Sequence, residues 1–224
     1  ELLDWADHDV SALLGISTDD TLTMINPDNT PAYIEQAGQG VWRLYRIEGD
    51  TVILQPYPVL LARTLDGHAA FMLVTDWILR RALPGALPPW LHQGLVEYVG
   101  EDGVHLNNYM AEFRTGDKDV LLSPPLIDAI LARGVDPDEN VDRENFRRAC
   151  YSAFLMVWQL VEYEGGLQPL QDFLAQAAAG ADLDEAARLA WGMDLATLAG
   201  LVDPAVSGEP AGGRIPARKP HVQP

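Results

Sequence analysis

The sequence contains a single cysteine, Cys150, among 224 residues. One cysteine cannot form an intrachain disulfide, and it excludes every CxxC metal or redox motif. Its surroundings, RACYSAFLMVW, are mostly apolar, so we expect a small buried side chain rather than a nucleophile.

Long apolar runs are also missing, because the longest, from about Ala149 to Val161, is interrupted by Ser152 and Gln159. No run reaches the ~18 residues that span a bilayer, which predicts no transmembrane segment.

Several catalytic motifs are absent as well. The sequence has no GxSxG nucleophile elbow, no GxGxxG or GxxxxGK(S/T) phosphate-binding loop, and no cysteine paired with a nearby histidine. The carboxylates in DPDENVDRE lack the fixed spacing of a cation-binding loop and are typical of a solvated loop. These absences argue against hydrolases with a nucleophile elbow and against nucleotide-binding proteins that depend on such loops.

Basic residues are scarce: 15 lysines and arginines stand against 33 aspartates and glutamates, a formal net charge of −18. Residues 203–224 carry a small net positive charge, so the excess of negative charge lies on residues 1–202. A body this acidic repels nucleic acid and anionic lipid, and we expect neither as a partner. Its surface suits solvation, a basic partner or cations.

The apolar pattern predicts strands near the N-terminus. Residues 1–20 are compatible with a short helix, TLTMI (residues 21–25) predicts a strand, and NPDNTP (residues 26–31) predicts a turn. Two β-rich runs in VWRLYRIEGDTVILQPY predict a hairpin around Gly49 and Asp50.

From Leu65 onward the apolar spacing becomes helical. Trp77, Trp90 and Trp158 fall at apolar helical positions, which predicts core side chains. Residues 101–122 are expected to form an irregular or short-stranded segment. The expected class is α+β with a helical majority, in one domain over residues 1–202: a β-rich part at about 20–62 and a helical part at about 65–202. The expected helices are 65–83, 88–99, 123–134, 142–166 and three shorter ones within 167–202.

The C-terminal tail, residues 203–224, holds five prolines and three glycines and few large apolar residues. This composition predicts an extended segment that builds no core of its own. We interpret the tail as a partner-binding arm in a larger protein assembly. Ile215 and Val222 supply small apolar anchors, and Arg214, Arg218 and Lys219 meet acidic groups on another subunit or on this protein's own acidic body.

One helix motif points to a known family. LPPWLHQGLVEY, residues 87–98, resembles the second zinc-ligand motif of the peptidase MA-like gluzincins, thermolysin-related zinc peptidases, in which a helix opens with a sequence like PxWLxEGLAEY. The match includes Pro88, Trp90, Gly94 and Glu97, and the element order from about residue 30 to residue 202 is similar to the family's. The resemblance implies a gluzincin-like body with two helices facing a metal cleft.

The resemblance also implies which residues occupy the former metal site. The family's spacing assigns its two zinc histidines to Met72 and Asp76, its base glutamate to Leu73 and its zinc glutamate to Gln93. Glu97 matches the carboxylate that orients a zinc histidine. We call these five the relic positions.

The thioether of Met72 and the amide of Gln93 are poor substitutes for the zinc ligands of the family, and the hydrocarbon side chain of Leu73 cannot act as a base. The resemblance therefore predicts no metal, no cofactor and no metallopeptidase activity. If the parent geometry persists, Met72→His, Leu73→Glu, Asp76→His and Gln93→Glu together should create a zinc site. Glu97 is expected either to accept a hydrogen bond from Gln93 or Tyr98 or to face solvent.

These residues favour a catalytically inactive pseudo-peptidase that acts as an interaction or structural subunit. One alternative is a hydrolase with a relocated site that uses Asp76, His92 and Glu97, and His68 adds a further donor if a metal has moved there. Another is a module that binds a peptide or small ligand in the relic cleft.

The chain begins at Glu1 rather than Met, which suggests that a signal or anchor was removed; because such relatives are often exported, we favour the cell envelope.

Overall fold

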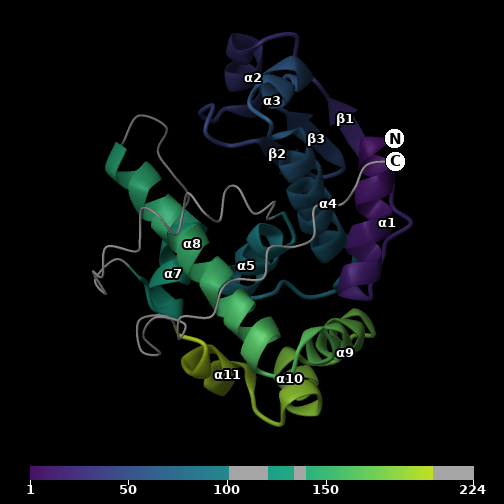
Figure 1. Cartoon of the computed structure of the whole chain (residues 1–224), viewed down its shortest axis with the longest axis vertical. Coiled ribbons are helices and arrows are strands. Elements are labelled where there is room, and N and C mark those ends of the chain that lie inside the picture. The colour runs from purple at the N-terminus through teal and green to yellow at the C-terminus, as the bar shows by residue number, and fades with distance from the viewer. Residues whose placement is uncertain (101–120, 134–139, 204–224) are drawn as a thin grey trace.

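A computed structural model describes residues 1–100, 121–133 and 140–203 and confirms the predicted α+β class (Figure 1). A small sheet lies near the N-terminus, and helices make up most of the rest. The elements, in chain order, are α1 (Leu2–Leu14), β1 (Thr23–Ile25), α2 (Thr30–Ala37), β2 (Tyr45–Glu48), β3 (Thr51–Leu54), α3 (Tyr57–Ala62), α4 (Asp66–Ala82), α5 (Pro89–Gly100), α7 (Pro124–Arg133), α8 (Asn140–Tyr163), α9 (Leu167–Ala178), α10 (Leu183–Trp191) and α11 (Leu195–Leu201).

The predicted hairpin is present. Strands β2 and β3 pair antiparallel across a turn at Gly49, which has a left-handed φ of 57°. Strand β1 pairs parallel with β3, so the sheet order is β1-β3-β2. The sequence did not predict this parallel pairing. Because β3 is central, Val52 is fully buried, whereas all three residues of β1 are exposed at the sheet edge.

Two short helices, α2 and α3, lie in the part that was predicted to be β-rich. The segment NPDNTP was predicted to be only a turn, yet its second half begins α2. The Asn29 side chain accepts a hydrogen bond from the Ala32 backbone N–H at 3.0 Å, and Pro31 stands in the first helical turn. Asparagine followed by proline is as typical of a helix N-terminus as of a turn, which explains the error.

The main core forms around α5, which packs against α4 on one side and α8 on the other (Figure 1). Trp77, Trp90 and Trp158 are at most 5% exposed, as predicted. The Asp128 carboxylate of α7 accepts a hydrogen bond from the Trp90 backbone N–H at 2.7 Å, which satisfies one of the orphan donors at the start of α5.

The C-terminal helices begin and end at capping residues and join the same core. Asp182 and Asp194 cap the starts of α10 and α11, and α10 ends at Gly192 with a left-handed φ of 76°. The largest group of buried apolar residues extends from Ala6 to Val202, so both ends of the described chain contribute to one core. Within the described ranges, no helix combines the length and apolar character needed to cross a membrane.

Candidate functional site

A cavity of about 700 Å³ lies between β2 and the loop before it, helices α4 and α5, and the N-terminal half of α8. This volume falls in the range of small-molecule sites, roughly 300–1,000 Å³. Four of the five relic positions line it: Met72 and Asp76 from α4, and Gln93 and Glu97 from α5. The structure therefore brings to one cavity Gln93 and Glu97, which belong to the matched motif, and Met72 and Asp76, which were assigned by the family's spacing from that motif.

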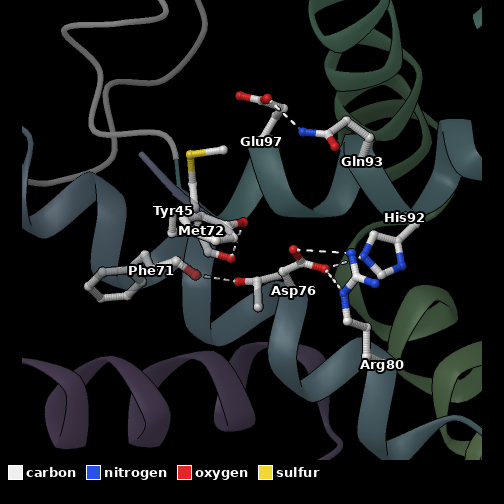
Figure 2. Close-up of polar contacts among 9 residues, drawn as sticks. Tyr45, Phe71, Met72, Asp76, Arg80, His92, Gln93 and Glu97 are labelled. Carbon is white, nitrogen blue, oxygen red and sulfur yellow. Dashed lines mark hydrogen bonds and ion pairs between the residues drawn. The ribbon is translucent and has the colours of Figure 1, made fainter. Parts of the chain in front are cut away.

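Asp76 is held by two donors (Figure 2). Arg80 Nε and His92 Nε2 both donate to its Oδ1, at 2.6 and 2.7 Å. Burial by itself raises the pKa of Asp76, but the hydrogen bond from His92 and the charges of His92 and Arg80 outweigh that effect and lower the pKa. Asp76 is thus an ionised carboxylate engaged by its own neighbours, which makes it a poor general base at neutral pH.

Gln93 and Glu97 are bonded to each other one helical turn apart on α5. Gln93 Nε2 donates to Glu97 Oε1 at 2.8 Å (Figure 2). Of the alternatives for Glu97, the structure therefore has the hydrogen bond from Gln93. The Tyr98 hydroxyl instead donates to Glu162 at 3.4 Å.

Met72 and Leu73 are neighbours in α4 but face different surroundings. Met72 lines the cavity, and its backbone carbonyl accepts a hydrogen bond from the Tyr45 hydroxyl at 3.2 Å. Leu73, the position that the resemblance assigns to the base, is fully buried in an apolar cluster beside Val52 and Leu60. Successive helical residues point about 100° apart, so Met72 and Leu73 cannot both face the cavity squarely.

Cys150 lines the cavity from α8 and is buried, as predicted. Burial raises the pKa of its thiol well above the usual value, and the nearby charge of Glu97 raises it further. The thiol therefore stays protonated at neutral pH and is not an activated nucleophile.

The donors in the cavity do not fit a zinc peptidase site. His68 Nδ1 donates to the Gly100 backbone carbonyl at 2.6 Å, and His92 is bonded to Asp76. In the described part of the chain, no three histidine, cysteine, aspartate or glutamate side chains are grouped so that they could hold a metal. The thioether of Met72 and the amide of Gln93 supply only soft or neutral donors at the relic positions.

Sequence reasoning missed the arginines of this cavity. Six line it, which is six of the ten arginines in the described ranges: Arg43, Arg46, Arg63, Arg80, Arg143 and Arg147. A signal was present in the composition, because the chain has 13 arginines and only two lysines. Lysine serves solubility as well as arginine does. Arginine is favoured over lysine where an oxyanion is bound through paired N–H donors.

Some predicted features lie outside the described residues. They include the proposed partner-binding residues Arg214, Ile215, Arg218 and Lys219, and residues 101–120 of the irregular segment predicted over 101–122.

Comparison with known proteins matched no protein family, no curated protein and no solved structure. The resemblance to gluzincins therefore rests on the residues quoted above.

We expect Asp76→Asn to lower the stability at pH 7 by about 1–2 kcal/mol, because the amide loses the charge-assisted bonds from Arg80 and His92. The folded-state pKa of Asp76 is lowered from 3.8, so this stability is present above that value and lost as the pH falls through the lowered pKa. Urea unfolding from pH 7 to pH 2 should show the curves of wild type and variant converging in acid. Asp172→Asn, at an exposed position, is the control and should cost much less; equal losses would contradict the assignment.

Proposed function

We propose that the protein is a pseudo-peptidase, a scaffold resembling the gluzincins whose former metal cleft now binds a ligand and performs no hydrolysis. One observation carries this proposal: Met72, Asp76, Gln93 and Glu97 line one cavity of small-molecule size. Their polar groups are bonded to neighbouring side chains rather than arranged around a shared point. Such a cavity can select and hold a ligand, whereas Asp76 is not poised as a base and Cys150 is not poised as a nucleophile.

An interaction role follows from the same proposal. A scaffold that has lost its catalytic groups and still keeps a formed cavity serves through what it binds, as a subunit or carrier in a larger assembly. The tail residues Arg214, Ile215, Arg218 and Lys219 remain the proposed attachment point to a protein partner.

A relocated hydrolase is the second candidate, and the contact between His92 and Asp76 favours it. A carboxylate that orients an imidazole is a common arrangement in hydrolases. Two features weigh against it. Arg80 donates to the same Asp76 oxygen as His92, and the buried thiol of Cys150 has a pKa raised well above the usual value.

Hydrolysis assays separate the two candidates. Wild type, Asp76→Asn and His92→Gln should be compared on unfolded casein and on p-nitrophenyl acetate. We expect wild-type turnover to equal that of both variants and of the buffer. Turnover that is at least about tenfold above the variants, in proteins shown to be folded, would overturn the pseudo-peptidase proposal in favour of the hydrolase.

A further inference from the structure

The charge of the cavity is opposite to that of the molecule. The whole chain carries a formal charge of −18, yet the described residues that line the cavity include six arginines and only three acidic residues. The acidic residues are Asp76, Glu97 and Glu144. Cations gathered in one concave region of an acidic protein focus a local positive potential there.

Half of these arginines have acidic partners. Arg80 is paired with Asp76 at 2.6 Å, Arg46 forms an ion pair with Glu48, and Arg147 Nε lies 3.6 Å from Glu144. The other three are Arg43, Arg63 and Arg143. Within residues 1–100, 121–133 and 140–203, none of these three forms an ion pair with a carboxylate, so their charges remain available to a ligand.

The guanidinium of Arg43 lies over two aromatic rings. Its guanidinium carbon lies 4.1 Å from the centre of the Phe146 ring and 5.1 Å from that of Trp42. Cation–π contacts restrict the guanidinium without using its N–H groups as hydrogen-bond donors, so these groups can still donate to an anion. The Tyr33 hydroxyl and the Gln55 amide donate to the backbone carbonyl of Arg43, which holds the loop before β2 in place.

Helix α8 supplies the opposite side of this region. Arg143, Phe146 and Arg147 are three and four residues apart, so they share one face of the helix. Since Arg43 stacks on Phe146, its guanidinium stands beside this face and near two like charges. Such a cluster costs free energy when no anion is present, and an anion relieves that cost.

We propose that the ligand of the cavity is a small oxyanion with more than one negative charge, carried on phosphate or carboxylate groups. Arg43 and Arg143 bind it directly, and Arg63 and Arg147 add to the positive potential. This inference rests on the proposed function, because it names the ligand class of the same cleft. Guanidinium groups match both oxyanions through paired N–H donors, and the acidic body repels anions everywhere else.

The test is calorimetric titration with pyrophosphate and, separately, with citrate, at constant ionic strength. The double variant Arg43→Gln/Arg143→Gln removes the two direct contacts. Arg133→Gln/Arg188→Gln changes the net charge equally at positions outside the cavity lining. The exposed position of Arg143 makes Arg143→Gln a second variant that should fold normally even if the loss of Arg43 disturbs the stack on Phe146.

We expect wild type to bind at least one probe with one site per chain. The cavity double variant should bind it about tenfold more weakly or worse, and the control double variant within about twofold of wild type. The probe that binds more tightly identifies the group that the cavity prefers. Arg143→Gln should weaken binding in the same direction.

Absence of binding by wild type to both probes overturns the inference, as does equal weakening in the cavity and control variants. Neither result touches the proposed function, because a neutral or cationic ligand in the same cleft leaves the pseudo-peptidase proposal in place. The hydrolysis assays decide that proposal separately, whether or not the anions bind.

Discussion

Leu73→Glu is expected to destabilise the fold by about 4 kcal/mol or more, because it places a carboxylate at a fully buried apolar position. The side chain packs beside Val52, Leu54 and Leu60, between α4 and the sheet. The desolvated carboxylate should have a raised folded-state pKa. The destabilisation should therefore be smaller in acid, where only the neutral carboxyl is buried, and grow as the pH rises through the unfolded-state value of about 4.3. Thermal and urea unfolding at pH 4 and pH 7 measure both effects.

Two controls isolate the cause. Leu61→Glu introduces the same charge at a position that is 53% exposed and should change the stability by no more than about 0.5 kcal/mol. Leu73→Met keeps the volume and should cost less than about 1.5 kcal/mol. If Leu73→Glu is as stable as Leu61→Glu, position 73 faces the cavity after all. The expected instability also revises the fourfold substitution meant to restore a zinc site, because its glutamate at position 73 would enter the core.

Gly94→Ala is expected to lower the stability by about 2 kcal/mol or more, although alanine favours a helix over glycine. A Cβ at this position would lie 2.4 Å from the backbone carbonyl oxygen of Ala153 and 2.6 Å from a methyl group of Val157, both on α8. A backbone oxygen cannot move aside as a side chain does, so α5 and α8 must separate. The effect should appear as a lower midpoint in thermal or urea unfolding.

Gly67→Ala is the matched control for this helix substitution. It lies in α4, and an added Cβ there meets nothing within 4 Å. Its stability should equal that of wild type or rise by up to about 1 kcal/mol. Should Gly94→Ala behave like Gly67→Ala, the close approach of α5 and α8 would be wrong.

The sequence predicted those parts of the fold that depend on local signals. Helices α4 and α5 follow from apolar residues at helical spacing and from the prolines near residues 84–89 that separate them. The hairpin follows from Gly49 and Asp50 between two β-rich runs. The pairing of β1 with β3 was missed because the partners, such as Thr23 and Thr51, are far apart in the chain, and nothing local specifies a parallel neighbour.

The candidate site was predicted only in part for a similar reason. Gln93 and Glu97 came from one motif and Met72 and Asp76 from the family's spacing to it, and the structure places all four in one cavity. Leu73 was assigned to the same site by the family's spacing, but the direction of its side chain depends on which face of α4 meets the sheet. The arginines come from several separate segments, so only the packing of the elements brings them together.

Calorimetric titration of the EDTA-treated, dialysed protein with zinc at pH 7 measures whether the cleft is still a zinc site. We expect no site with a Kd of about one micromolar or tighter, because Asp76 is engaged by Arg80 and His92, and Met72 and Gln93 offer a thioether and an amide. One zinc ion bound per chain at that affinity, lost in Asp76→Asn while Asp172→Asn retains it, would mean that the cleft still binds zinc and that the protein is not a pseudo-peptidase.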